Sequence, residues 1–246
     1  MLRSLPPLTA IVTLMVLSSN ALGADFSFGV VGTRTSSVYK DTPPQNAAFP
    51  FVSIVSERGY LKGTEVGYSL LPNDSRQNIS AIVEYNMDSF DPKDSNNKQM
   101  QLLDRRKAAA MAGIRLKYNF LFAKLVTDIS NRHDGYYGLV GAAYPVNVSA
   151  WRITPSITYK YLDKKMSNHL YGVSQAESIR TGGVIPEYDS TSTHKMTIAV
   201  RGDYSVNASL NLFVGVSHSD YKRVLDSPMV TKDYSYSLST GIIYHF

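Results

Sequence analysis

The sequence predicts an all-β fold, namely a transmembrane, antiparallel, up-and-down β-barrel. Three observations favour it: long segments alternate between apolar and polar residues, aromatic residues lie at the segment ends, and full charges lie on the polar face. A two-residue period indicates a strand, because successive side chains point to opposite faces of a sheet. About 9–11 residues carry a tilted strand across a bilayer, whereas strands of soluble sheets usually have about 5–6.

The first 23 residues have the features of a secretory signal peptide. A basic start at Arg3 precedes an apolar stretch over residues 8–17 and small residues near Gly23. We expect cleavage before Ala24, since the apolar stretch is well short of the ~20 residues that a membrane-spanning helix requires. The expected barrel domain is residues 24–246, and its formal charge falls from +5 to +4 because Arg3 is lost.

The composition narrows the possible functions. The chain contains no cysteine, so no disulfide stabilises it. No histidine pair has metal-ligand spacing, and we expect no cofactor. Its basic residues are spread along the chain rather than clustered, so we expect no nucleic-acid partner.

The strands follow one another along the expected barrel domain. The most regular ones are expected at residues 78–89, 108–120, 151–162, 194–206, 208–221 and 234–246, and less regular ones at 26–35, 49–71, 122–131 and 136–146. This assignment gives ten strands, with residues 49–71 forming one long kinked strand. Twelve remains the alternative, with a split at residues 57–59 and a further strand or hairpin within residues 163–193.

The ten-strand assignment also orients the barrel, because barrels of this class have short periplasmic turns and longer outer loops. Short turns are expected in the periplasm at residues 72–77, 120–122, 147–150 and 206–208. Long loops are expected outside the cell at residues 36–48, 90–107, 132–135, 163–193 and 222–233.

Charges on the polar face distinguish a barrel from a soluble β-sandwich. A dry sandwich core would not tolerate unpaired charges, and lipid does not tolerate an open sheet edge, so the strands must close into a barrel. The charges then form a network in the lumen, for which the candidate residues are Glu65, Glu84, Arg115, Lys117, Arg152, Lys160, Arg201 and Asp203. Mutual neutralisation would fill a narrow barrel, whereas the surplus of positive charge would suit a small, anion-preferring pore.

The last strand ends in an outward-facing row that includes Ile242, Tyr244 and Phe246. Its edge stays open until the barrel closes. We therefore expect these three residues to be the assembly signal that the barrel-insertion machinery binds by strand addition.

Two sequence features raise the possibility of catalysis, but neither favours an enzyme. His133 and Asp134 lie in an expected outer loop and could act as acid and base, yet the Asp-Gly pair that follows His133 is typical of a turn. Ser217 and His218 are neighbours on one strand, so they point to opposite faces and cannot pair. The sequence indicates a non-enzymatic protein.

Several stretches together are similar to the MipA/OmpV family of outer-membrane proteins, whose name refers to an MltA-interacting protein. They are SVYKDTPPQNAAFPFVSIVSERGYLKG, SNRHDGYY, WRITPSITYKYLDKKMSNHLYGVSQAES, DSPMV and the final YHF. The chain departs from the expected pattern at Gln175, where proline often follows YGVS. The resemblance implies an outer-membrane location in a Gram-negative bacterium.

The resemblance also implies a function and partners. It implies a scaffold linking a lytic transglycosylase to a murein synthase, with outer-membrane lipid and the insertion machinery as further partners. A small anion-preferring pore and an adhesin that acts through its surface loops remain the alternatives.

Overall fold

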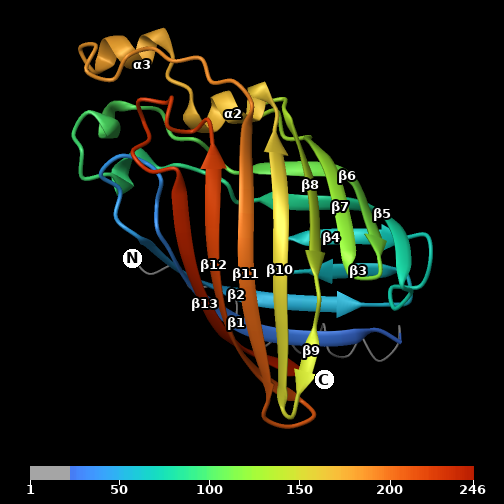
Figure 1. The fold of residues 1–246 in the computed structure, drawn as a ribbon. Helices are drawn as coiled ribbons and strands as arrows, with labels where there is room; N and C mark the ends of the chain where they lie inside the picture. The colour runs from blue at the N-terminus through green and yellow to red at the C-terminus, as the bar shows by residue number, and fades with distance from the viewer. Residues whose placement is uncertain (1–22) are drawn as a thin grey trace, which may run out of the picture.

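The computed structural model describes residues 23–246, which form a closed antiparallel barrel (Figure 1). The expected signal peptide lies outside the described residues except for Gly23. The strands are β1 (Asp25–Thr35), β2 (Gln45–Val55), β3 (Gly59–Lys62), β4 (Glu65–Ser69), β5 (Gln77–Asn86), β6 (Ala109–Tyr118), β7 (Leu121–Asp128), β8 (Tyr136–Ala143), β9 (Val146–Val148), β10 (Trp151–Leu162), β11 (Thr193–Ser205), β12 (Leu210–Lys222) and β13 (Tyr234–His245). Two short 3-10 helices (Pro92–Asp94 and Met100–Leu102) and two α-helices, α2 (Lys164–Tyr171) and α3 (Gln175–Arg180), lie between strands.

Each strand pairs with its neighbours in the chain, and the seam between β1 and β13 closes the barrel. The strands β8 and β9 both pair with β10 and are successive parts of one strand, interrupted at Tyr144 and Pro145. Pro145 has no amide hydrogen and cannot continue the ladder. The wall therefore has twelve strands.

The prediction of ten strands is wrong. The alternative of twelve is correct in number, and its split at residues 57–59 coincides with the turn between β2 and β3, but its further strand is β4 rather than one within residues 163–193. Residues 49–71 form the end of β2 followed by β3 and β4, with turns at residues 56–58 and at Gly63. Gly63 has a φ of +59°, which glycine adopts without strain. Residues 163–193 hold α2 and α3 rather than a strand.

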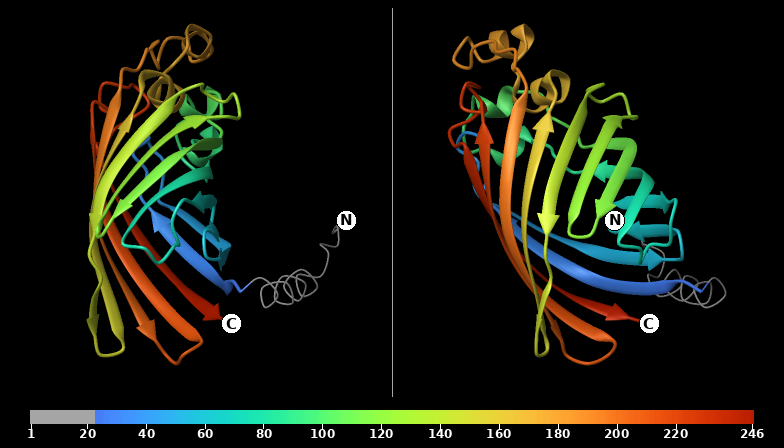
Figure 2. Two further views of the ribbon diagram at one scale, coloured as in Figure 1. Left: turned by 90° about the vertical axis from the view of Figure 1, so that its right-hand side faces the viewer. Right: turned by 45° about the vertical axis from the view of Figure 1, so that its right-hand side comes forward.

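The expected grouping of short turns at one end and long loops at the other is nevertheless confirmed. The structure has three strands, β2, β3 and β4, where one was expected. The two additional reversals cancel, so every later strand runs in the direction that was expected. The turns that follow β2, β4, β6, β9 and β11 lie at one end of the barrel, and the long loops lie at the other with α2 and α3 (Figure 2).

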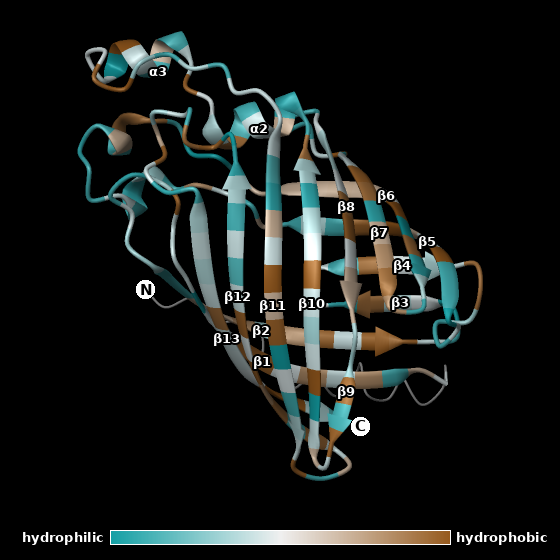
Figure 3. Cartoon of the chain, in the orientation of Figure 1, coloured by the Kyte–Doolittle hydropathy of each residue, from teal (hydrophilic) through white to brown (hydrophobic). Residues whose placement is uncertain are grey.

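The two faces of the strands also match the expected alternation. The outward side chains of Ile198, Val200 and Leu212 are 52%, 42% and 41% exposed, which suits contact with acyl chains. Trp151 and Tyr204 pack together at the periplasmic end with ring centroids 5.1 Å apart. Apolar bands recur along the strands in Figure 3. None of the helices in residues 23–246 is long and apolar enough to span a membrane.

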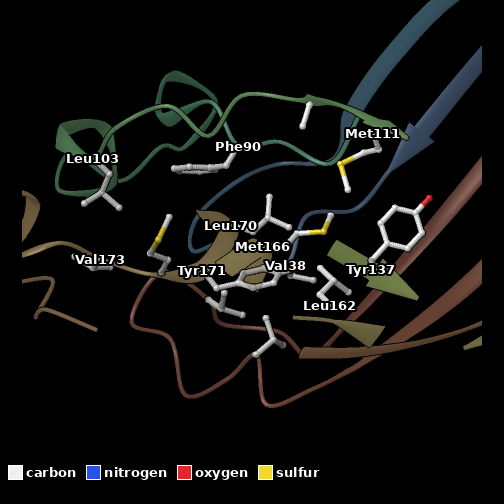
Figure 4. Close-up of a cluster of buried hydrophobic side chains, with 14 of the residues drawn as sticks. Val38, Phe90, Leu103, Met111, Tyr137, Leu162, Met166, Leu170, Tyr171 and Val173 are labelled. Carbon is white, nitrogen blue, oxygen red and sulfur yellow. The ribbon is translucent and has the colours of Figure 1, made fainter. Parts of the chain in front are cut away.

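The outer loops form a packed cap over the outer end of the barrel. Its dry core joins α2 to the loops and to residues of β5, β6, β7, β8 and β10 (Figure 4). Buried members include Phe90, Met100, Leu103, Met166 and Leu170. Burial of apolar side chains from several loops stabilises a single arrangement of those loops.

Candidate functional site: the lumen and its two ends

Two carboxylates face each other across neighbouring strands of the lumen wall. Glu65 of β4 and Glu84 of β5 are paired in register, which is unfavourable for like charges. The ammonium of Lys124 on β7 lies between them, 2.5 Å from Glu65 and 2.6 Å from Glu84. Arg115 of β6 adds a second ion pair to Glu65 at 2.7 Å. The carboxylates are thus neutralised inside the barrel.

Two tyrosines complete this cluster. The hydroxyl of Tyr60 donates a hydrogen bond to Glu65 at 2.8 Å, and that of Tyr137 donates one to Glu84. Lys124, Tyr60 and Tyr137 were absent from the candidate residues predicted from sequence. Residues 122–131 alternate poorly, so Lys124 could not be assigned to a face, although its isolation among apolar residues was a usable signal.

A second group of charges lies nearer the cap. The ammonium of Lys160 on β10 is 2.6 Å from the Asp88 carboxylate and 4.1 Å from the centre of the Tyr137 ring. Lys195 of β11 is paired in register with Lys160 and lies 5.1 Å from the Tyr221 ring. Burial raises the pKa of Asp88, but the two ammonium groups outweigh that effect and hold it well below its usual range.

A third group lies near the periplasmic end. Arg201 donates two close hydrogen bonds to Asp203 on the same strand, at 2.7 and 2.9 Å, and its guanidinium lies 3.8 Å from the centre of the Phe213 ring. Arg152 of β10 and Arg201 line one hollow at this end of the barrel, but Arg152 has no ion pair among residues 23–246. Lys117 of β6 likewise has none within the described chain. The eight predicted residues therefore do not form one connected network.

An apolar layer lines one side of the lumen in the same region, on the neighbouring strands β12, β13, β1 and β2. Val31, Phe213 and Ile243 are buried together, and Phe49 and Phe51 of β2 pack against them. Because Phe213 also stacks with Arg201, this layer is continuous with the periplasmic ion pair. The lumen wall thus carries an apolar patch on this side in addition to its polar groups.

The periplasmic end carries a hollow of about 690 Å³ formed by β9–β12 and their turns. Arg152, Asn147 and Asn211 supply polar groups, and Trp151 lies at its edge. The neighbouring Val148 is 54% exposed. This hollow opens at the end of the barrel where the short turns lie.

The cap contains a buried ion pair. Arg106 and Glu177 of α3 lie 2.7 Å apart, and Glu177 is 2% exposed. Glu177 also accepts hydrogen bonds from the backbone amides of Asp104 and Ser174, at 2.9 and 2.8 Å. Burial raises the pKa of Glu177, but these amides and Arg106 outweigh it and lower the pKa.

The histidines of the cap have no hydrogen bond to a carboxylate in the described chain: Nδ1 of His133 lies 3.8 Å from Oδ2 of Asp128 and instead accepts from the amide of Gly135, and the His169 ring contacts the carbonyl of Lys107. His133 and His169 lie with ring centroids 5.4 Å apart, and burial lowers the pKa of both. Asp128 accepts hydrogen bonds from the backbone amides of His133 and Asp134, which fixes the loop as a turn. No group of three potential metal ligands occurs in residues 23–246.

The three residues of the expected assembly signal lie on the seam of the barrel. Tyr244 and Ile242 are outward-facing, in register with Phe28 and Val30 of β1. The amide of Phe246 donates to the carbonyl of Phe26 at 3.1 Å, and their rings lie 5.0 Å apart. The last residue therefore pairs with the first strand.

Comparison with known proteins identifies relatives along nearly the whole chain. The putative outer membrane protein YiaT of Escherichia coli K12 is 24% identical over 93% of this chain and 94% of its own length. The MltA-interacting protein of Escherichia coli K12 is 26% identical over 97% of this chain and 98% of its own length.

Among solved structures, the NanC porin aligns with a TM-score of 0.44 and 10% identity over 88% of this chain and 98% of that chain. The KdgM porin in complex with disordered oligogalacturonate aligns with a TM-score of 0.41 and 13% identity over 89% and 99%.

One of these relatives is named as a putative outer membrane protein, and this barrel is likewise an outer-membrane protein. The family model described as MltA-interacting protein MipA matches residues 28–246, which include every strand from β2 to β13 and most of β1. The chain therefore belongs to the MipA family of outer-membrane proteins.

Proposed function

We propose that this barrel is a non-enzymatic outer-membrane scaffold whose periplasmic end binds a lytic transglycosylase and a murein synthase. The observation that carries this proposal is the neutralised and capped lumen. Lys124 and Arg115 neutralise the lumen carboxylates, the Phe213 layer lines one side of the lumen, and the cap packs over the outer end. The name of one relative, MltA-interacting protein, supports a partner of the murein-cleaving class.

The hollow lined by Arg152 and Asn147 is the proposed docking site. Its recess lies beside exposed aliphatic residues, Val148 and Val206, which are 54% and 46% exposed. An apolar contact surrounded by hydrogen-bonding groups is typical of a protein interface. The guanidinium of Arg152, which has no ion pair within the part of the chain that the structure describes, would favour an acidic side chain of the partner.

Site-specific photocrosslinking tests this proposal. A photoreactive amino acid at Val148 should crosslink to a murein hydrolase or synthase in intact cells, whereas one at Ile179 of the cap should not. Both positions are exposed, so accessibility is matched. If folded protein gives no periplasmic crosslink from Val148, Val206 or Asn147, the scaffold proposal is wrong.

A small pore makes a different prediction. The ion pairs of Arg115 and Arg201 leave these guanidinium groups neutralised, so a pore that depends on their free charge is not favoured. Planar bilayers containing the purified barrel should stay silent. Steady anion-preferring currents that fall in Arg115→Glu or Arg201→Glu would support the pore instead.

Adhesion is a second candidate, favoured by the tip of the cap. Ile179 and Val184 are 72% and 63% exposed, which is unusual for aliphatic residues on an outer loop. If these residues contact a surface partner, Ile179→Ser with Val184→Ser should reduce attachment of cells to that surface. Crosslinking from Val148 should be unchanged in the same variant.

A further inference from the structure

The barrel wall has a gap beside β2. This strand pairs with β1 along its whole length but with β3 through Ser53, Ile54 and Val55 alone. The β3–β4 hairpin turns back at Gly63, whose amide reaches the carbonyl of Val52. Above this turn, no strand lies between β2 and the end of β5; β3 and β4 are visibly shorter than their neighbours in Figure 1.

Pro50 is positioned as an edge residue should be. Pro50 lies two residues before Val52, so the backbone groups of both residues point to the same side of β2. The carbonyl of Val52 points toward β3, and the backbone of Pro50 therefore points into the gap. Proline has no amide hydrogen to lose there, and it is typical of strand edges. The sequence of β2 is thus compatible with a permanent gap at this point.

A cavity of about 510 Å³ passes through the gap. Its lining includes Asn46 and Met87, which belong to the outward rows of β2 and the segment after β5. It also includes Lys160, Lys195 and Thr33, which face the lumen. Because one cavity touches both faces of the wall, we call the gap between residues 46–50 and 87–89 the lateral window, and the space behind it the chamber.

The deep wall of the chamber has a surplus of positive charge. Lys160 and Lys195 are adjacent, and Asp88 is the single carboxylate near both of them in the described chain. The other charges of the lining lie at the outer rim, where Arg105 pairs with Asp91 at 3.3 Å and Asp94 is exposed. Hydroxyl groups of Thr33, Thr35 and Ser235 face the same space.

The lateral window also lies at the height of the lipid headgroups. Tyr85 and Tyr236, two outward residues near the outer ends of their strands, are 53% and 57% exposed, as is typical of the aromatic belt at a bilayer surface. Met87, 56% exposed, extends this apolar rim. The cap covers the axial route, so the window is the direct way from the outer leaflet to the chamber.

We propose that the lateral window admits the anionic headgroup of an outer-leaflet lipid into the chamber. Lys195 and Lys160 bind the phosphate, the hydroxyl groups of Thr33, Thr35 and Ser235 complete its hydrogen bonds, and the acyl chains remain outside along Met87 and Tyr85. Phosphate is well suited to this arrangement, because charge-assisted hydrogen bonds from ammonium groups are stronger than neutral ones.

Native mass spectrometry of the detergent-purified mature chain tests this proposal. Phosphatidylglycerol should bind about tenfold more tightly than phosphatidylcholine with the same acyl chains, because the choline cation beside the phosphate of the latter is repelled by Lys160 and Lys195. Lys195→Gln should abolish this preference, and Lys222→Gln, an exposed lysine at the end of β12, should retain it. Equal binding of both lipids, or an unchanged preference in Lys195→Gln, would overturn the proposal.

A soluble competitor separates a lipid from a free anion. If glycerol 3-phosphate displaces phosphatidylglycerol at comparable concentrations, the chamber binds a soluble anion and the lipid proposal is wrong. Weak competition, needing at least a hundredfold excess, supports entry from the bilayer.

Fluorescence quenching tests the route independently. Because the chain contains no cysteine, Ala47→Cys can be labelled at a single site. A bimane at this window position should be quenched by phospholipids that carry a nitroxide near the headgroup. A bimane at Ala199→Cys, which faces the lumen on β11 away from the window, should not. Equal quenching at both positions, or none at residue 47, contradicts a lateral route.

Discussion

The two walls of the barrel are stabilised differently. The long wall, β10–β13 with β1, has strands of 11–13 residues that pair with both neighbours along most of their length. The short wall, β3–β8, contains strands of four, five and eight residues. Fewer backbone hydrogen bonds hold the short wall, and its inner side chains instead join the Glu65–Lys124–Glu84 cluster and the cap core.

This difference shows that a barrel wall does not need uniform strands. Where the ladder is long, alternation and backbone pairing suffice. Where it is short, buried ion pairs and a packed cap supply additional stability, and the wall can keep an opening such as the lateral window. The following experiments test that division, from the largest expected effect to the smallest.

Removing Lys124 should have the largest effect, because it leaves two opposed carboxylates in the short wall. Lys124→Met should lower the free energy of unfolding by about 3–5 kcal/mol, as is typical when one partner of a buried ion pair is lost. Urea unfolding in detergent, followed by the fluorescence of Trp151, measures it. Lys117→Met on the neighbouring strand is the matched control and should change stability little; equal losses would contradict the assigned role of the cluster.

Leu170→Ala in α2 should destabilise the cap by about 2–5 kcal/mol, because a 3% exposed leucine leaves a cavity in the cap core. Limited proteolysis of the outer loops and thermal unfolding measure this loss. Leu212→Ala in the long wall faces lipid and should cost clearly less, since acyl chains refill the space. A larger effect at Leu212 would show that the cap does not support the barrel.

Acidification should loosen the cap before the long wall. The lowered pKa of Glu177 means that its contribution is fully present above the ordinary pKa of glutamate, about 4.3, and is lost as the pH falls through the lower folded value. Proteolysis of the outer loops should therefore rise below about pH 4, with a local loss of about 1–3 kcal/mol. Glu177→Gln should remove this step, and a pH-independent cap in the unsubstituted protein would contradict it.

Phe246→Ala should have the smallest effect on stability. Loss of its aromatic contacts with Phe26 and Tyr244 should cost about 1 kcal/mol. If Phe246 is also part of the assembly signal, the variant should insert more slowly in a reconstituted insertion assay. Phe120→Ala, at a periplasmic turn and paired with Tyr144, is the matched control and should insert normally. Equal insertion rates would assign Phe246 a structural role alone.

The sequence predictions are correct for the strands of the long wall and fail at the start of the short wall. Residues 151–162 and 194–206 alternate over their full length, and the structure places every inward and outward side chain of these strands as expected. Residues 49–71 gave no comparable signal. The sequence pattern here indicates one aromatic, apolar strand that includes Phe49, Phe51 and Tyr60. The chain instead reverses direction twice, because each short strand is completed by its pairing with neighbouring strands.

The sequence predicted that the candidate charged residues face the lumen, but it could not predict which of them form ion pairs. Alternation placed Arg115 and Arg201 inside the barrel, but it could not assign Glu65 to Lys124, since strand register and shear determine which charges meet. The cap was missed for a related reason. Val38, Phe90 and Leu170 come from separate loops without a shared period, and they become one core when the loops meet above the barrel.

The sequence by itself determined that the chain forms a lipid-embedded barrel, which residues face lipid, and which end carries the long loops. These properties follow from a local two-residue period and from the lengths of segments between strands. Only the tertiary structure decided the number of strands, the partners of the buried charges, the closure of the outer end and the lateral window. Each of these depends on where strands distant in sequence end relative to one another, and no local pattern encodes that offset.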